Sequence, residues 1–286
     1  ITINALAQPN QADAGPDQEL CVPTDSTLLA GNTPIFPATG TWTVIAGTGV
    51  FADASDPGTL VSTLSIGVNT FRWTVDNGPC ANPITFDEVT VILYDDSTSA
   101  ADAGPDQEVC LPLTSTVMAA APPQAPATGS WTLIGGSGTI VDPASPTSAI
   151  TDLTVGISTF VWTLDNGPCP PNGIMSDTIQ IYVYDPTAPT ADAGPDQELC
   201  TPQVNTMMQG NIPAFPGEGT WSLLSGSGTI VEPNNPFTMI TDMAVGENVF
   251  VWQIYNGQCG FGPPSTDTVN VFIFDENQPP AQTGPD

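Results

Sequence analysis

The stretch that decides the fold is residues 12–21, ADAGPDQELC, because the chain repeats it. It returns as ADAGPDQEVC at residues 101–110 and unchanged at residues 191–200, and a shortened copy, AQTGPD, occupies residues 281–286. The copies start 89, 90 and 90 residues apart. A fixed period of this length predicts a tandem array of small domains, one for each repeat.

The repeat sets the expected domain boundaries. Repeats 1, 2 and 3 are predicted at residues 12–100, 101–190 and 191–280. Residues 1–11 would be the end of a preceding repeat with its linker, and residues 281–286 the start of a fourth. The chain is therefore expected to be a window on a longer protein.

The charge balance excludes several classes of function. The only base is Arg72, there is no Lys or His, and thirty carboxylates give a net charge of −29. Nucleic-acid binding needs several cations to neutralise phosphates, and anionic lipid would repel this chain, so neither is an expected partner. No apolar run is long enough to span a membrane, so no insertion is expected in this window. Without histidine, the usual Ser-His-Asp and Cys-His arrangements cannot be assembled, and we do not expect an enzyme.

The hydrophobic pattern predicts short β-strands. In residues 70–75, apolar Phe71, Trp73 and Val75 alternate with polar residues, and an Asn-Gly turn signal follows at residues 77–78. The other two repeats show the same pattern. Each repeat has a second tryptophan on another predicted strand, and six tryptophans in register indicate core packing rather than ligand platforms. These second tryptophans are Trp42, Trp131 and Trp221.

The six cysteines occur as two per repeat, 59 residues apart. Without histidine and without short cysteine spacings, a zinc site is not indicated. We predict one disulfide inside each repeat, which would contribute about 4 kcal/mol in the chain-entropy treatment. Such bonds place the protein in an oxidising, extracellular compartment. The predicted pairs are Cys21 with Cys80, Cys110 with Cys169, and Cys200 with Cys259.

About seven short strands, a disulfide and a buried tryptophan per repeat are typical of an immunoglobulin-like (Ig-like) sandwich. The opening ADAGPDQ and the late phrase FRWTVDNG at residues 71–78 resemble PKD-like repeats. The likeness covers all three repeats and is greatest to the cysteine-bearing repeats of gliding-motility adhesins exported by the type IX secretion system. Repeat 3 departs from the late phrase, reading FVWQIYNG at residues 250–257, and the Trp-Asp-Phe-Gly-Asp signature of many PKD domains is absent. The resemblance implies all-β tandem Ig-like/PKD-like sandwiches in an elongated string, and a filamentous or adhesive role at the cell surface.

Acidic residues gather in sequence around each expected junction between repeats. Oxygen ligands near a short linker suit Ca²⁺, which would then stiffen the array, although no cofactor is required by the rest of the sequence. The alternative is that these residues form solvated turns, since Gly-Pro-Asp favours a turn whatever its charge. The candidate ligands are Asp95, Asp96, Asp102, Asp106, Asp185, Asp192, Asp196 and Asp275.

Two threonines lie in short Asp-Thr-apolar motifs. These are Thr178 and Thr268, and the motif resembles the O-glycosylation pattern of the same group of bacteria.

The sequence favours an extracellular structural region: a stiff, disulfide-clipped spacer in an adhesin stalk or filament. One alternative is a carbohydrate- or protein-binding module that uses loops such as residues 47–56, with Phe51 and Phe237 as candidate contacts. Another is a self-assembling fibre subunit. The expected partners are neighbouring repeats of the same chain, other copies in a fibre, and an unidentified surface or glycan target.

Overall fold

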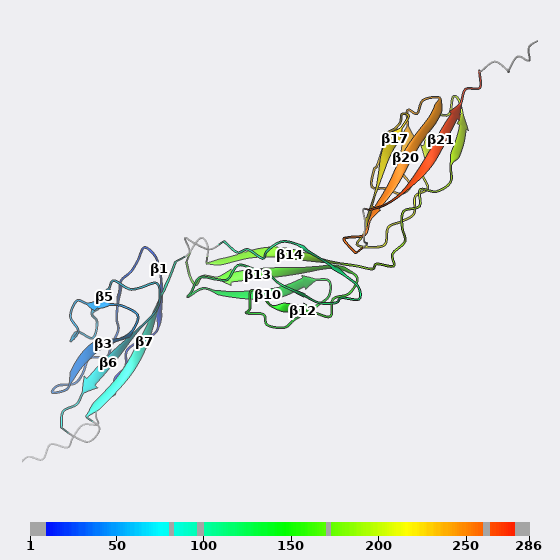
Figure 1. The fold of residues 1–286 in the computed structure, drawn as a ribbon. Coiled ribbons are helices and arrows are strands. Elements are labelled where there is room, and N and C mark those ends of the chain that lie inside the picture. The colour runs from blue at the N-terminus through cyan, green and yellow to red at the C-terminus, as the bar shows by residue number, and fades with distance from the viewer. Residues whose placement is uncertain (1–9, 80–82, 96–99, 170–172, 260–263, 278–286) are drawn as a thin grey trace, which may run out of the picture.

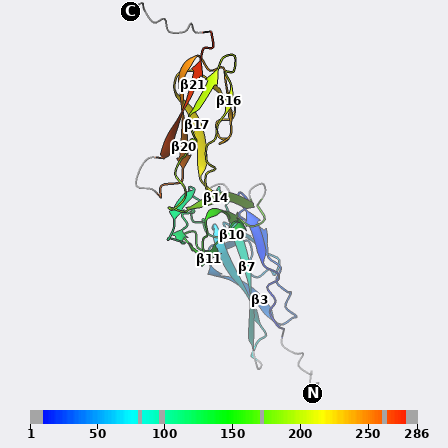
Figure 2. The same ribbon diagram turned by 90° about the vertical axis from the view of Figure 1, so that its right-hand side faces the viewer.

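A computed structural model describes residues 10–79, 83–95, 100–169, 173–259 and 264–277. Within these residues every regular element is a β-strand, and the strands form three sandwiches that follow one another along the chain (Figure 1). In a view turned by 90°, β21 of the third sandwich again lies far from β3 of the first (Figure 2). The predicted all-β fold of tandem Ig-like sandwiches is confirmed.

Each sandwich pairs a four-stranded sheet with a three-stranded sheet. In repeat 1 the larger sheet has the order β1 (Gln18–Cys21), β7 (Ile84–Tyr94), β6 (Gly67–Asp76), β3 (Thr39–Ala46). The smaller sheet has the order β2 (Thr27–Leu28), β5 (Leu60–Ser62), β4 (Val50–Phe51).

The other two repeats have the same topology. In repeat 2 the sheets are β8 (Gln107–Cys110), β14 (Ile174–Tyr184), β13 (Gly156–Asp165), β10 (Thr128–Gly135), and β9 (Thr116–Val117), β12 (Ala149–Thr151), β11 (Thr139–Ile140). In repeat 3 they are β15 (Gln197–Cys200), β21 (Ser265–Phe274), β20 (Gly246–Tyr255), β17 (Glu218–Ser225), and β16 (Thr206–Met207), β19 (Met239–Thr241), β18 (Thr229–Ile230).

Strand direction gives each sandwich two distinct ends. β6 and β7 are antiparallel, so Asp76, the last residue of β6, lies opposite Ile84, the first residue of β7. β1 runs parallel to β7, so Cys21 lies opposite Tyr94, the last residue of β7. We call the end where β6 finishes and β7 begins the proximal end, and the end where β1 and β7 finish the distal end. The chain leaves β7 at the distal end, which therefore faces the next repeat.

The core of each repeat is built on its two tryptophans, as the alternating pattern predicts. The side chains of Phe71, Trp73 and Val75 on β6 are fully buried. Trp42 on β3 packs against Trp73 with ring centroids 5.0 Å apart, and the equivalent pairs in the other repeats have the same separation. Gly40 lies under the Trp73 ring, where any side chain would collide with it. All six tryptophans are thus structural.

Repeat 2 departs from its neighbours at one buried hydrogen bond. In repeats 1 and 3 the indole N–H of the β6 or β20 tryptophan donates to the main-chain and side-chain oxygens of an asparagine, Asn32 or Asn211, at 3.1–3.2 Å. Ala121 holds the equivalent position in repeat 2. The buried Nε1 of Trp162 has no hydrogen-bond partner among the described residues. An unpaired buried donor costs about 1–3 kcal/mol.

Candidate functional site: the junctions between repeats

The disulfides cross the junctions between sandwiches. Cys21 of repeat 1 is bonded to Cys169 of repeat 2, with the Cα atoms 5.5 Å apart. Cys110 of repeat 2 is bonded to Cys259 of repeat 3, with the Cα atoms 5.3 Å apart. The predicted pairing within each repeat is therefore wrong for these four cysteines.

The physical reason is strand direction. Cys21 lies at the distal end of its sandwich, opposite Tyr94, while the second cysteine of a repeat follows the strand that finishes at the proximal end. The ten steps from Ile84 to Tyr94 along β7 separate these ends, which is about 33 Å at the rise of a strand. A disulfide needs Cα atoms about 4.4–6.8 Å apart, so the two cysteines of one repeat cannot meet in repeats 2 and 3. The distal cysteine instead reaches the proximal cysteine of the next repeat.

Two cysteines remain outside these bonds. Cys200 at the end of β15 is an exposed free thiol. Cys80 lies outside the described residues, so its predicted pairing with Cys21 is excluded only by the partner that Cys21 has.

Polar contacts from Glu108 support the junction between repeats 2 and 3. The Tyr255 hydroxyl donates to Glu108 Oε1 at 2.8 Å, and the Gln258 main-chain N–H donates to Glu108 Oε2 at 3.0 Å. Glu108 lies on β8, two residues before Cys110, so these bonds and the disulfide hold the same turn of repeat 3.

An aromatic ring fills each junction because the facing turn has glycine. Gly257 lies against the ring of Tyr184, and its positive φ of 69° suits the tight Asn-Gly turn. In the first junction Gly167 lies against Tyr94 in the same way, where a Cβ would come within 2.5 Å of the ring. Any larger residue at either glycine would push the sandwiches apart. Sequence reasoning treated these Asn-Gly pairs only as turn signals.

The junction environment raises the pKa of three tyrosines. Burial, followed by the Glu108 carboxylate and the nearby tyrosines Tyr255 and Tyr182, raises the pKa of Tyr184 to about 12. The hydrogen bond to Glu108 is the first cause that raises the pKa of Tyr255. Burial, followed by Glu19, raises the pKa of Tyr94. The neutral hydroxyl is therefore the form that fits each junction.

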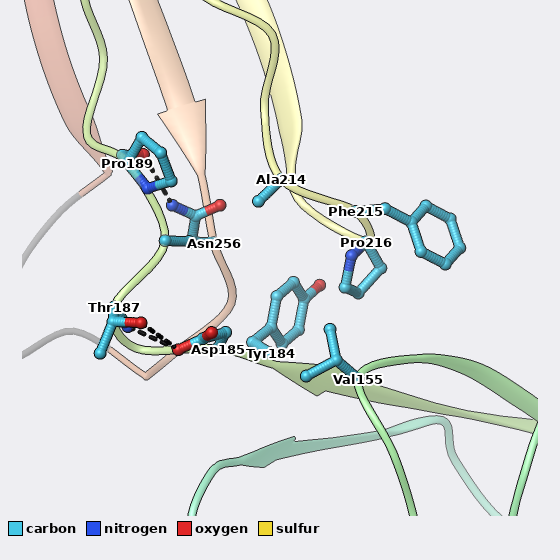
Figure 3. Close-up of a pocket in the computed structure, with 10 residues that line it drawn as sticks. Val155, Tyr184, Asp185, Thr187, Pro189, Ala214, Phe215, Pro216 and Asn256 are labelled. Atoms are coloured by element: carbon cyan, nitrogen blue, oxygen red, sulfur yellow. Dashed lines mark hydrogen bonds between the residues drawn. The ribbon is translucent and has the colours of Figure 1, made fainter.

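A small pocket of about 210 Å³ lies between repeats 2 and 3. Figure 3 shows Tyr184 and Val155 of repeat 2 on one side of it, with Phe215 and Pro216 of repeat 3 on the other. The Phe215 ring lies 3.3 Å from the position of a Cβ on Gly156, at the start of β13. The sequence analysis did not predict Phe215 as a contact residue. An aromatic residue between two prolines in a loop, as in PAFP at residues 213–216, could have indicated such a contact.

The carboxylates predicted to bind calcium mostly hold their own repeat together. Asp106 and Asp196 accept main-chain N–H bonds at 2.7–2.8 Å from the last strand of their repeat, and so join β8 to β14 and β15 to β21. Asp102 and Asp192 accept from the N–H two residues on, and close the turn before these strands.

The remaining candidates lie around the linkers. The Asp185 and Asp275 side chains accept turn bonds, and the Thr187 bonds lower the pKa of Asp185. Asp95 also has an interaction, and Asp96 lies outside the described residues. Across the described part of the chain, no three Asp, Glu, Cys or His side chains come together as a metal site would need.

Both predicted glycosylation sites lie on the last strand of their repeat. Thr178 on β14 and Thr268 on β21 are exposed. The aspartate before each accepts the main-chain N–H of an alanine in the opening phrase at 2.8 Å.

The predicted binding-loop aromatics lie in different environments. The Phe51 ring packs against the core rings of Phe71 and Trp42, at centroid distances of 5.6 and 6.5 Å. Phe237 is partly exposed in a loop of repeat 3. Phe51 is therefore part of the core rim rather than a residue presented to a ligand.

The fold and its junctions define the class of this chain: a tandem array of Ig-like/PKD-like β-sandwiches with disulfides between successive domains. No protein-family model matches the chain, and no curated protein sequence matches it. Among the residues with described structure, no helix is long and apolar enough to cross a membrane.

Several solved structures are similar to the chain. The three Ig domains I67–I69 of titin cover 92% of this chain and 96% of their own, at 12% identity and a TM-score of 0.36. A complex of Dpr2 Ig1–Ig2 with DIP-Theta Ig1–Ig3 covers 93% and 100%, at 11% identity and a TM-score of 0.44. The PKD domain of the KIAA 1837 protein covers 34% and 98%, at 28% identity and a TM-score of 0.27. With TM-scores below 0.5, the fold assignment rests on the strand topology itself.

Proposed function

We propose that the chain is the structural repeat region of an extracellular adhesin stalk or filament, in which it acts as a stiff spacer. The observation that carries this proposal is the pair of disulfides between sandwiches, Cys21–Cys169 and Cys110–Cys259. A covalent bond between neighbouring domains limits their relative movement, which is what a stiff spacer needs.

The junctions have the features that a stiff spacer requires. The backbone and a disulfide cross each junction as two separate covalent links, which oppose bending and twisting of one sandwich against the next. At the second junction the Tyr184 ring fills the interface, and Glu108 binds the facing turn. The linker at residues 185–190 contains Pro186 and Pro189, which further restrict it.

The proposed location is the outside of the cell. Disulfides persist in oxidising compartments, and a strongly negative surface keeps a repetitive β protein soluble. The resemblance to gliding-motility adhesins favours export by the type IX system and a role in surface adhesion or gliding. Thr178 and Thr268 are exposed, which supports both as O-glycosylation acceptors. An intact mass of native protein equal to the sequence mass would remove the glycosylation proposal.

Electron microscopy of native cell-attached or secreted material tests the spacer. We expect a single file of particles about 40 Å apart, the length of a sandwich with strands of about ten residues. Treatment with a reductant should increase the bending between particles while each particle stays intact. A thicker fibre with several chains in cross-section would replace the spacer with a polymer subunit, and unchanged bending after verified reduction would remove the proposed role of the disulfides.

A further inference from the structure

Repeat 3 has a surface groove beside the pocket at its junction. This groove has a volume of about 540 Å³ and lies between the loop before β17, the start of β17 and the loop that joins β18 to β19. Ligand sites commonly have volumes of about 300–1,000 Å³, so the groove is large enough to hold a ligand or a side chain of a partner. Four apolar and two polar side chains line it: Ile212, Pro213, Phe215 and Pro236, and Glu218 and Asn234.

The apolar walls of the groove are open to solvent. Ile212 is 68% exposed and Phe215 is 66% exposed. In Figure 3 the Phe215 ring points away from Asn256, so much of the ring is free for contacts outside the junction. Pro213 lies over Gly219, where a Cβ would come within 3.0 Å of the proline ring, and this packing fixes the loop against β17. Exposed apolar side chains around a hollow are typical of a binding surface.

The polar groups of the groove are free to accept hydrogen bonds but not to donate them. Glu218 is exposed at the start of β17, and its carboxylate has no hydrogen bond or ion pair with any described residue. The Asn234 Nδ2 group already donates to the Gly219 carbonyl at 3.3 Å and to Thr220 Oγ1 at 3.2 Å. The side-chain oxygen is therefore the part of the Asn234 amide that is left for a ligand. A ligand that fits must donate hydrogen bonds, and the carboxylate favours a positive charge on it.

Of the three repeats, only repeat 3 has this pair of polar groups. The three repeats share one topology, so the fold itself does not require Glu218 or Asn234. The equivalent residues have neither a carboxylate nor an amide: they are Thr39 and Ser55 in repeat 1, and Thr128 and Ala144 in repeat 2. Side chains that the fold does not require, gathered at one groove, are candidates for binding.

We infer that the groove of repeat 3 binds a lysine side chain of a partner protein, with the ammonium group at Glu218 and the alkyl stem along Ile212 and Phe215. An ammonium group only donates hydrogen bonds and carries the charge opposite to that of the carboxylate, and the lysine stem is apolar. A free diamine fits less well, because its second ammonium group would lie over apolar walls without a partner.

The partner is a different protein from this chain. The 286 residues contain no lysine, so a second copy of them cannot supply the side chain. Their net charge of −29 also repels a second copy and attracts a basic protein. The inference goes beyond the spacer role, because it gives one repeat of the array a binding partner.

An NMR titration of the whole ¹⁵N-labelled chain tests the inference. The probe is Nα-acetyl-L-lysine methylamide, and the control compound has a methyl group in place of the ammonium group. We expect the lysine probe to shift amide signals of residues 212–219 and of Asn234. The control compound should bind about tenfold more weakly, as expected when a charge-assisted hydrogen bond is lost. The diamine 1,5-diaminopentane should also bind more weakly than the lysine probe.

Matched variants separate the groove from general attraction to an acidic protein. Glu218→Gln should weaken binding of the lysine probe by about tenfold. Glu247→Gln removes the same charge from an exposed position at the other end of the sheet, and should leave binding unchanged. Ile212→Thr should weaken binding by about threefold through lost apolar contact. Val231→Thr changes an exposed valine that does not line the groove, and should have no effect.

Four results would overturn the inference: equal binding of the lysine probe and the control compound, shifts spread evenly over all three repeats, equal effects of Glu218→Gln and Glu247→Gln, or tighter binding of the diamine. Shifts of the same amides by a neutral sugar such as methyl α-glucoside, without shifts by the lysine probe, would replace it with a carbohydrate site. Each variant is first shown to keep the denaturation midpoint of the unaltered chain, so that a loss of binding is not a loss of folding. None of these results depends on the junction disulfides, so this inference and the proposed function fail independently.

Discussion

The Cys110–Cys259 bond should be a major source of stability for repeats 2 and 3. The double variant Cys110→Ser/Cys259→Ser removes this bond, and Cys200→Ser is the matched control that keeps both junction disulfides. The bond closes a loop of 149 residues. For a loop of this size the chain-entropy relation gives about 17 cal/mol/K, or about 5 kcal/mol at 25 °C. This is an upper value, because native strain and residual structure in the unfolded chain reduce it.

Guanidinium denaturation followed by tryptophan fluorescence measures the effect, since every repeat has a buried tryptophan pair. With a slope of about 4 kcal/mol/M, the loss of up to about 5 kcal/mol lowers the midpoint by on the order of 1 M. The single variants Cys110→Ser and Cys259→Ser should each lower the midpoint as much as the double variant, because either one removes the same bond. Additive single effects would show that the two cysteines belong to different disulfides and would refute the pairing between repeats.

Four further outcomes follow from the same structure. Ala121→Asn should stabilise repeat 2 by about 1–2 kcal/mol in thermal unfolding, because it supplies the acceptor that Trp162 lacks. Tyr184 is neutral in the folded junction and its pKa is raised from about 10 to about 12. Its contribution to stability should be complete below pH 10 and lost as the pH rises toward 12, and denaturation midpoints measured over this pH range check it. A protease site inserted at residues 185–190 should, when cut, release repeat 3 only after reduction, as judged on non-reducing gels. Calcium or a chelator should leave the melting temperature unchanged, because six of the eight candidate aspartates already accept main-chain hydrogen bonds; a shift of several degrees would restore the calcium prediction.

Much of the fold could be predicted from local sequence pattern. The alternation around Trp73 predicts a strand with one buried face, and the 90-residue period predicts three domains with the same core. The first signal is local and the second is periodic, so both can be recognised in the sequence without knowledge of the tertiary structure. The three-stranded sheets consist of strands of two or three residues, too short for a pattern to define them.

The junction could not be predicted because periodicity hides the partner. In a regular repeat, disulfides within a domain and disulfides between neighbouring domains would use the same cysteines at the same spacings. The sequence pattern therefore fits both kinds of pairing equally well. Only the parallel course of β1 along β7 places Cys21 at the distal end. The sequence did contain one hint, since both cysteines lie at strand ends, whereas an Ig disulfide joins the middles of two strands. The Tyr184–Gly257 contact depends in the same way on which ends of repeats 2 and 3 face each other, so it could not be predicted from the sequence either.

The pairing between repeats also determines how tension travels through the molecule. From Cys169 the backbone follows β14 along the whole of repeat 2, crosses the linker at residues 185–190, and runs beside β21 to Cys200 at the far end of repeat 3. Within this route the fully extended part is β14, Ile174–Tyr184, which spans about 33 Å at about 3.3 Å per residue.

A pull on Cys21 reaches Cys169 directly through the disulfide and is then carried along β14. The rest of each sandwich lies beside the route that bears the load, and not within it. Tension therefore passes from one domain to the next through the disulfides as well as through the linkers.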